Sequence, residues 1–226
     1  MKTNIIGDCI EILPNISDID LIITDPPYNI GWKYSSKVND NRTDYHYWCL
    51  KWAKLCFKTL KDNGVMCIIN YPDNNNVLYT RLIEEGYNFV QQLIWNYHPH
   101  AGVNKRRYTK SYRTILIFSK SKEYVFNPVK QPYKNLNDKR IKKRIEEGSK
   151  GTNHYDLFTI QQCKNVSKSK KKIGINQLPD ELVDMLISTY SREGDLILYP
   201  FVGNGTVIDR AECFNRSSIG IDINDY

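Results

Sequence analysis

The sequence has no C-x-x-C pair, no apolar run long enough to cross a membrane, and no internal repeat. Its six cysteines are irregularly spaced and lie mostly in apolar segments, where a free cysteine packs as a small hydrophobic residue. This spacing argues against structural zinc and favours a reducing compartment. The first residues, MKTNIIGDCIEIL, place an acid where a signal peptide needs an uninterrupted apolar core. We therefore expect a cytoplasmic protein with no metal and no membrane association.

A chain of 226 residues with 41% hydrophobic residues is large enough for one substantial domain, residues 1–226, with its own core. Short β-branched runs alternate with segments of helical apolar spacing, and this order favours a three-layer α/β sheet. Asn63-Gly64 is expected to end the first long helix, and Pro179 to occupy the first position of a later one. The expected strands include 3–8, 20–25, 65–70, 91–97 and 113–120, and the expected helices include 45–61 and 74–86.

The net charge of +7 is concentrated in one segment. Residues 120–172 contain 15 Lys and Arg against 5 Asp and Glu, so the remainder of the chain is slightly acidic. A basic segment on an acidic body suits contacts with phosphates, because each contact releases condensed counterions. The alternative is a solvated helix face at 138–147 followed by a flexible basic loop at 167–172.

A glycine pair near the carboxyl terminus lies in the stretch LYPFVGNGTVIDRAECFNRSSIGID. A predicted strand is followed by a turn with Gly203 and Gly205, a helix, and a second strand that ends at Asp222. Glycines allow a ligand to approach the backbone, and an acid 19 residues after Gly203 is placed to bind ribose hydroxyls. No phosphate-loop lysine follows, so the expected ligand carries a ribose without needing phosphates. A simple tight turn is the alternative interpretation.

The stretch LIITDPPYNI ends a predicted strand with Asp25, Pro26, Pro27 and Tyr28. The prolines enforce an extended backbone and remove two N–H donors, so the Asp25 carboxylate and the Pro26 carbonyl can both project as acceptors. Two acceptors beside an aromatic ring suit the exocyclic amino group of a flipped base: the acceptors bind its hydrogens and the ring stacks on the base. The alternative is a proline-broken strand end with a buried tyrosine.

DPPY followed by PFVGNGT and IGIDI closely resembles the amino-group DNA methyltransferases that use S-adenosylmethionine (AdoMet). The DPPY form is typical of the N6-adenine enzymes. Its position before the glycine motif resembles the β group, whose Rossmann-like sheet is circularly permuted. The resemblance implies a site-specific enzyme that methylates adenine in double-stranded DNA. It also implies that residues 120–172 form an inserted target-recognition segment, and a homodimer is among the expected assemblies.

The resemblance assigns roles to individual residues. Asp25 and the Pro26 carbonyl would accept hydrogen bonds from the target amine, while Pro27 completes the motif and Tyr28 stacks on the base. Asp222 would bind the ribose of AdoMet. The implied cofactor-binding residues are Asp8, Cys9, Asp25, Asn176, Gln177, Pro200, Phe201, Gly203, Asn204, Gly205, Thr206 and Asp222. The chain departs from the family pattern at Gly174, Leu178 and Tyr199.

Basic residues outside the motifs are expected to contact DNA. They are Lys33, Arg42, Lys105, Arg106, Arg107, Lys170, Lys171 and Lys172. His98 and His100 lack a third ligand nearby and are interpreted as loop residues. Four alternatives stay open: an N4-cytosine enzyme, an RNA target, a weakly active DNA-binding partner of an active subunit, and a nicotinamide oxidoreductase, which the missing third glycine disfavours.

Overall fold

The computed structural model describes residues 1–31, 40–98, 105–163, 177–203 and 205–224, and the structural statements below concern these residues. The helices are α1 (Cys9–Ile12), α2 (Tyr45–Thr59), α3 (Pro72–Glu84), α4 (Lys139–Glu146), α5 (Asp180–Tyr190) and α6 (Thr206–Cys213), with a 3-10 turn at Leu13–Asn15. The strands are β1 (Lys2–Ile6), β2 (Ile19–Thr24), β3 (Leu60–Asn70), β4 (Asn88–Asn96), β5 (Tyr112–Ser119), β6 (Lys130–Gln131), β7 (Thr152–Asn153), β8 (Leu157–Thr159), β9 (Leu196–Tyr199) and β10 (Ser217–Asp222).

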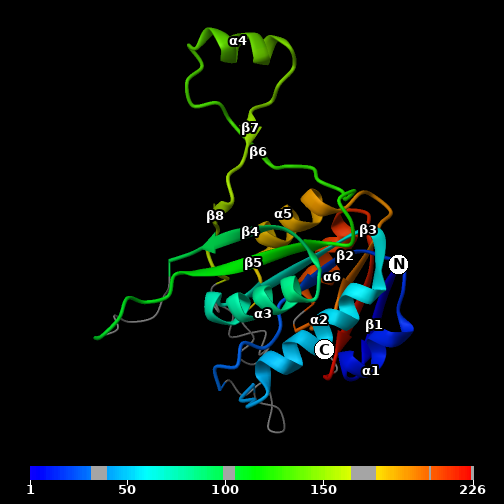
Figure 1. The fold of residues 1–226 in the computed structure, drawn as a ribbon. Helices are drawn as coiled ribbons and strands as arrows, with labels where there is room; N and C mark the ends of the chain where they lie inside the picture. Colours follow the sequence, from blue (N-terminus) through cyan, green and yellow to red (C-terminus); the bar gives the residue numbers. More distant parts are fainter. Residues whose placement is uncertain (32–39, 99–104, 164–176, 204, 225–226) are drawn as a thin grey trace, which may run out of the picture.

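The central sheet has eight strands in the order β1-β10-β9-β2-β3-β5-β4-β8, with helices on both faces (Figure 1). On one face, Trp52 of α2 and Leu82 of α3 pack in a cluster with Ile22 of β2. On the other face, Leu186 of α5 and Ile208 of α6 belong to a second cluster. Strands covered on both faces are apolar where they are covered, and the buried parts of β2 and β3, Leu21–Ile23 and Val65–Ile69, are continuous hydrophobic runs. The predicted three-layer α/β fold is confirmed.

The sheet is mixed: β5 runs antiparallel to both β3 and β4, whereas the strands from β1 to β3 in the sheet order are parallel. Two local expectations were wrong. The helix α2 ends at Thr59, and Gly64 lies inside β3, where an added Cβ would come within 2.9 Å of Leu60 and 3.0 Å of the Ile19 carbonyl. Pro179 is the N-cap of α5, so the helix begins one residue later than predicted.

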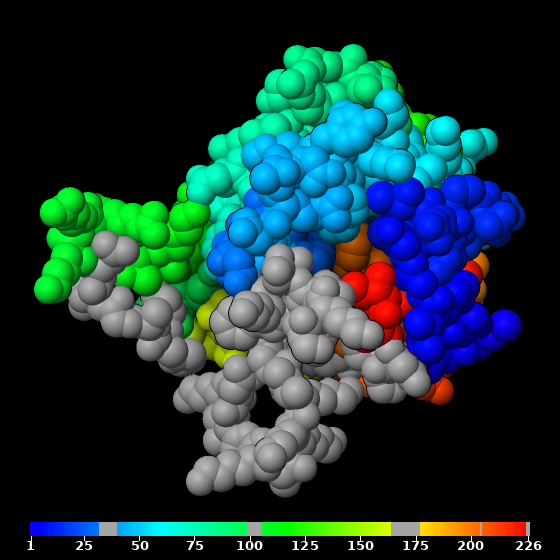
Figure 2. All heavy atoms as spheres, turned by 90° about the horizontal axis from the view of Figure 1, so that it is seen from below, coloured from blue at the N-terminus to red at the C-terminus, as the bar shows by residue number. Residues whose placement is uncertain are grey.

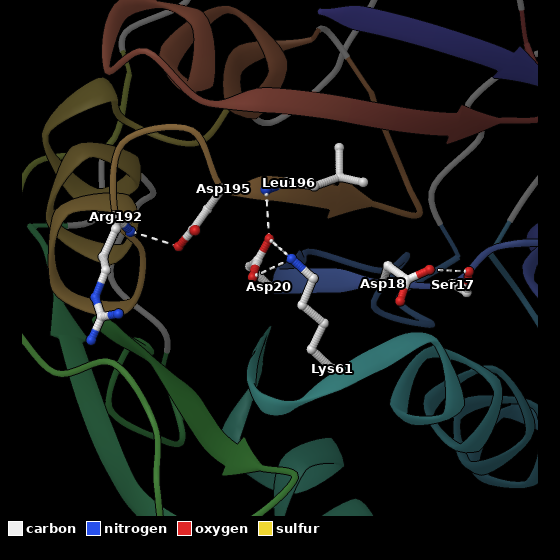
Figure 3. A network of polar contacts seen from close by, with 7 residues as sticks. All are labelled: Ser17, Asp18, Asp20, Lys61, Arg192, Asp195 and Leu196. Carbon is white, nitrogen blue, oxygen red and sulfur yellow. Dashed lines mark hydrogen bonds and ion pairs between the residues drawn. The ribbon is translucent and has the colours of Figure 1, made fainter.

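A polar network joins the amino-terminal ends of the central strands (Figure 3). The Asp20 carboxylate accepts hydrogen bonds from the Leu196 N–H at 2.9 Å and from the Lys61 ammonium at 2.8 Å. A second carboxylate, Asp195, accepts from the Arg192 N–H at 2.7 Å and closes the turn before β9. Asp20 therefore links β2, β3 and β9 at one edge, which fixes how their opposite ends meet.

Part of the basic segment forms an arm that projects from the sheet (Figure 1). The arm has a two-stranded stalk, β6 and β7, and carries α4 at its tip. At its base, the His154 N–H donates to the Val129 carbonyl at 2.8 Å, and β8 then joins the sheet beside β4. In the described part of the chain, no helix is long and apolar enough to cross a membrane.

Candidate active site at the ends of two central strands

The two sequence motifs meet in space although they lie far apart in the chain. DPPY follows β2 and the glycine loop follows β9, and these strands are parallel neighbours. The strands that come next along the chain, β3 and β10, lie on opposite sides of this pair. Such a reversal leaves a crevice at the carboxyl ends of the strands, where open α/β sheets bind their ligands.

Asp25 is half-buried at the end of β2 and accepts a hydrogen bond from the Tyr28 hydroxyl. Burial raises the pKa of the Asp25 carboxyl to about 6, against the lowering effects of the nearby Arg113 guanidinium and the Tyr28 hydroxyl. Since desolvation disfavours the charged form, Asp25 is a carboxylate above this pH with little water around it. A desolvated carboxylate is a strong hydrogen-bond acceptor.

The carbonyl groups of the motif are not equivalent. The Pro27 carbonyl accepts from the Tyr45 hydroxyl at 2.6 Å, and the Tyr28 carbonyl accepts from the Asn74 amide at 3.0 Å. Pro26 is buried, and among the described residues none donates a hydrogen bond to its carbonyl. Two carbonyls of the motif are therefore hydrogen-bonded within the protein, whereas the role of the Pro26 carbonyl as an acceptor for the target amine stays a prediction.

Asn70, the last residue of β3, organises this support and was missed by the sequence reasoning. Its amide donates to the Tyr45 hydroxyl at 2.9 Å, and its Oδ1 accepts from the Asn74 amide at 3.0 Å and from the Tyr71 N–H at 2.8 Å. The signal available in the sequence was an asparagine that ends a strand next to the DPPY strand. Asn70 thereby positions Tyr45 and Asn74, the two residues that bond the Pro27 and Tyr28 carbonyls of the motif.

The glycine loop after β9 has the geometry that only glycine adopts readily. Gly203 and Gly205 have φ values of 56° and 84°, and Gly205 is the N-cap of α6. The Asp222 carboxylate accepts a hydrogen bond from the Gly203 N–H at 3.1 Å. Burial raises the pKa of Asp222, with backbone hydrogen bonds acting in the opposite direction. The predicted acid and the predicted loop therefore lie together; Asn204 lies outside the described residues.

The other predicted loop residues divide between core and crevice. Pro200 and Thr206 are buried, and the Phe201 ring packs against Trp48 and Trp52 of α2, with ring centroids 5.6 and 5.3 Å apart. Phe201 consequently anchors the loop to the helical layer. This contact is a structural role that the sequence motif alone does not reveal.

Tyr199, a departure from the family pattern, is buried at the end of β9. Its pKa lies well above the ordinary value because of burial and the nearby carboxyl groups of Asp25 and Asp222. The chain therefore places a neutral phenol between the two acids of the site. Leu178, a second departure, is buried in the α5–α6 core cluster, and Gly174 lies outside the described residues.

Asp8 and Cys9, predicted to bind the cofactor, follow β1 at the same edge of the sheet. The preceding Gly7 N–H donates to the Asp222 carbonyl at 2.8 Å, which places this turn beside the glycine loop. Asp8 is exposed and caps α1 through the Ile10 N–H at 2.9 Å. Cys9 is buried, and burial raises the pKa of its thiol to about 12, so it packs as a core residue. Gln177 is half-buried before α5; Asn176 lies outside the described residues.

The residues predicted to contact DNA lie in different surroundings. Lys105, Arg106 and Arg107 are exposed on the segment that leads into β5, which projects from the body at the left of Figure 2. Arg42 is exposed and forms an ion pair with Asp44 at 3.0 Å. The predictions for Lys33, Lys170, Lys171 and Lys172 fall outside the described residues.

A family model described as DNA methylase (N6_N4_Mtase) matches residues 19–226. The chain belongs to this family. The membership confirms the predicted class, an AdoMet-dependent amino-group DNA methyltransferase. The methylase is 32% identical over 230 aligned positions to the Type II methyltransferase M.HpaI of Haemophilus parainfluenzae, covering 97% of this chain and 69% of that protein.

Two further similarities agree with this assignment. The DNA adenine methyltransferase YhdJ of Escherichia coli (strain K12) is 26% identical, covering 99% of this chain and 79% of that protein. Among solved structures, the M1.HpyAVI–SAM complex superimposes with a TM-score of 0.72 at 24% identity, covering 100% of this chain and 94% of that one. At that identity the structural likeness shows the fold of the methylase and no more.

Proposed function

We propose that the methylase transfers a methyl group from AdoMet to the N6 amino group of adenine at specific sites in double-stranded DNA. The observation that supports this most directly is the pair of acceptors at the end of β2: the Asp25 carboxylate and the open Pro26 carbonyl, with Tyr28 beside them. The glycine loop and Asp222 lie at the end of the neighbouring strand, so donor and acceptor would meet in one crevice.

The chemistry required of these residues is modest and specific. An adenine amine is a weak nucleophile because its lone pair is delocalised into the ring. Asp25 and the Pro26 carbonyl would each accept one amine hydrogen and favour a tetrahedral nitrogen, whose lone pair is then available. AdoMet supplies an electrophilic methyl group on a sulfonium sulfur. As the carbon–nitrogen bond forms, the carbon–sulfur bond breaks with its electron pair going to sulfur, and one amine proton passes to Asp25 and then to water.

Tyr28 would provide the stacking surface for the extruded base. Its ring is already oriented by the hydrogen bond to Asp25 and by an edge contact with Tyr71, with ring centroids 5.1 Å apart. In this structure the Tyr28 hydroxyl donates to the Asp25 carboxylate. When the target amine enters, its own hydrogen bond to Asp25 would replace the one from Tyr28. Extruding the base places the amine within reach, which is the reason such enzymes remove their target from the duplex.

Target recognition is assigned to the basic segment 120–172, and its described part, 120–163, contacts the central sheet at Lys120 and again at Ile160. The Lys120 N–H donates to the Gly64 carbonyl at 3.0 Å, near the amino end of β3. The Ile160 N–H donates to the Asn96 carbonyl at 3.0 Å, at the carboxyl end of β4 and thus on the side of Asp25. The segment would therefore contact DNA along its length, from the arm to the end of the sheet where Asp25 lies.

Asp222→Ala is expected to weaken AdoMet binding about tenfold or more, the effect of losing a charge-assisted hydrogen bond worth roughly 1.5–3 kcal/mol. Two causes act together, since the variant removes the acceptor for ribose and the partner of the Gly203 N–H. Isothermal titration calorimetry with AdoMet measures the change. Asp209→Ala, which removes an exposed acid from the neighbouring helix α6, is the matched control and should bind normally. Equal affinities of wild type and Asp222→Ala would place the ribose elsewhere.

Replacing Lys105, Arg106 and Arg107 together by Ala should weaken DNA binding and reduce its salt dependence. The slope of log K against log salt should fall by about two to three units, at roughly 0.9 per phosphate contact. Fluorescence anisotropy with a duplex between low and moderate salt gives this slope. AdoMet affinity should not change, because the segment lies outside the glycine loop.

The control for this variant removes the same charge from another surface. Lys51, Lys58 and Arg81 are exposed on α2 and α3. Their triple Ala variant lowers the net charge equally but should keep the wild-type slope. If both triple variants show the same slope, the projecting segment makes no phosphate contacts and the DNA path runs elsewhere.

The function itself is tested by incubating unmethylated duplex DNA with the protein and AdoMet, followed by mass spectrometry of the nucleosides. N6-methyladenine is the expected product. N4-methylcytosine would establish the second candidate, which the site supports because Asp25 and Pro26 recognise an amine and not a whole base. Sequencing of the modified DNA would then give the recognition site.

A further inference from the structure

Arg113, the second residue of β5, is buried in the structure with 1% of its surface exposed. A buried guanidinium is costly unless its charge is compensated and its donors are bonded. In the described part of the chain, its Nε and Nη1 atoms have no hydrogen-bond partner. The protein thus retains a desolvated cation with unbonded donors next to the apolar run Ile115–Phe118 of β5.

Aromatic rings surround this cation. The guanidinium carbon lies 4.5 Å from the ring centroid of Tyr28, 5.0 Å from Trp95, 5.4 Å from Tyr71 and 5.7 Å from Tyr97. These rings come from the ends of β2, β3 and β4, so three neighbouring strands converge on one charge. Attraction between a cation and ring faces is strongest where water is excluded. Arg113 is closest to Tyr28, the ring proposed to stack on the base.

Tyr28 connects this cation to Asp25, because its hydroxyl donates to the Asp25 carboxylate and its ring centroid lies 4.5 Å from the Arg113 guanidinium carbon. The titratable groups around the Asp25 carboxyl are Tyr28 in its own loop, Arg113 from β5 and Tyr199 from β9. Of these, the two tyrosines are neutral at physiological pH, since burial raises the pKa of each phenol well above its usual range. Arg113 is therefore the one positive charge among the described groups that act on Asp25, and it lowers the pKa of that carboxyl.

A purely structural role does not account for the residue. Replacing a buried charge by an apolar side chain of similar volume is often neutral or stabilising. A methionine could fill the space between four aromatic rings without an unsatisfied donor. The rings attract the cation, and its further effect is on Asp25, whose carboxyl has a lower pKa because of the charge.

We propose that Arg113 is a positioning residue of methyl transfer, which braces the Tyr28 ring and, through the Tyr28 hydroxyl, the Asp25 carboxylate that accepts the target amine. The inference rests on the proposed function, because it concerns the same site. It predicts that the positive charge is needed for the acidic side of the pH–rate profile, and that the planar guanidinium is needed for the orientation of Tyr28.

The experiment compares Arg113→Met, Arg113→Gln and Arg113→Lys by single-turnover methylation of duplex DNA across pH 5 to 9. The acidic limb of the pH–rate profile is the range in which the rate rises with pH. In the two neutral variants this limb should move to higher pH by about one unit or more, which means about a tenfold loss of rate near pH 6. Arg113→Lys keeps the charge and should keep the limb near its wild-type position, with a smaller loss of rate. AdoMet affinity should stay within about twofold of wild type.

Arg210→Met is the matched control. Arg210 is half-buried on α6 and donates to the Asp184 carboxylate at 2.5 Å, and it is not among the groups that act on Asp25. It should keep the wild-type limb. A direct titration of the Asp25 carboxyl by carbon-13 NMR, in the absence of DNA and AdoMet, separates this proposal from the function. If wild type methylates nothing, the proposed function fails, while the shift of Asp25 between wild type and the neutral variants still decides the role of Arg113.

Three results would overturn the proposal. One is a wild-type limb and an unchanged Asp25 titration in a folded neutral variant. Another is an equal displacement of the limb in Arg210→Met. The third is that both neutral variants fail to fold while Arg113→Lys folds, which would make the charge a requirement of folding and not of positioning.

Discussion

Asp25→Ala is expected to lower the single-turnover rate of methyl transfer by about 10²–10³-fold or more, the loss typical of removing a preorganised electrostatic group. The carboxylate is the charged member of the acceptor pair, and the Pro26 carbonyl alone would hold only one amine hydrogen. AdoMet affinity should remain close to wild type if Asp25 acts on the target amine alone, whereas a fall in affinity would support its other implied role, in cofactor binding. Transfer of a labelled methyl group to duplex DNA, with calorimetry for AdoMet, measures both.

The pH dependence of wild type follows from the same carboxyl. With its pKa raised to about 6, Asp25 gains its charge as the pH rises through that value, so the rate should increase on this limb and level off above it. Asp62→Ala, at an exposed acid on β3, should retain both the rate and the limb. Near-normal turnover by Asp25→Ala would remove the residue from the mechanism.

The raised pKa also has a consequence for stability. A carboxyl whose pKa is higher in the folded than in the unfolded protein favours folding in its neutral form, so its contribution is present below about pH 4 and is lost as the pH rises through about 6. Asp25→Asn mimics the neutral form. It should therefore unfold at a higher temperature than wild type at pH 8, with a smaller difference at pH 4, although it is inactive.

Gly220→Ala should displace the glycine loop after β9 through packing alone. A Cβ at Gly220 of β10 would lie 2.1 Å from the Ile208 Cδ1 and 2.5 Å from the Val202 Cγ2. Both neighbours hold the loop: Val202 donates its N–H to the Ile221 carbonyl at 3.1 Å, and Ile208 lies on α6, which the loop caps. Overpacking of this kind costs about 1–3 kcal/mol of unfolding free energy. AdoMet affinity should fall at least about tenfold as the loop moves.

The double variant Gly220→Ala with Ile208→Ala is the control for this prediction. Removing the Ile208 side chain relieves the closer of the two contacts but not the one with Val202, so AdoMet affinity should recover in part relative to the single variant. Denaturant unfolding monitored with calorimetry separates loss of stability from loss of binding. Unchanged affinity in Gly220→Ala would show that the loop position is insensitive to β10.

The sequence was sufficient to predict that the DPPY motif and the glycine loop with Asp222 follow strands, because these motifs are local. DPPY determines its own backbone through two prolines, and the glycine loop through residues that tolerate positive φ. The meeting of these motifs follows from the general rule that parallel strands present their carboxyl ends at one edge. For that reason, the site could be described as a pair of motifs before any contact was known.

Arg113 could not be assigned in this way, because its role depends on which strands are neighbours. In the sequence it is one polar residue at the start of a run of apolar strand residues. Only the antiparallel pairing of β5 with β3 and β4 places it behind Tyr28. Gly64 was misread for a related reason: a glycine after a helical pattern suggests a cap, while here it admits the close approach of the neighbouring chain at Ile19.

The stalk of the arm, β6 and β7, separates the residues at its tip from the candidate active site. Because the Val129 and His154 backbones are hydrogen-bonded, and Lys130 pairs with Asn153, the chain leaves the body and returns to it at one point. Whatever lies between these anchors can lengthen, shorten or be replaced with little effect on the ends of β2 and β9. The arm can therefore be replaced as one unit by a change within residues 130–153, without a change in the strands that carry the site.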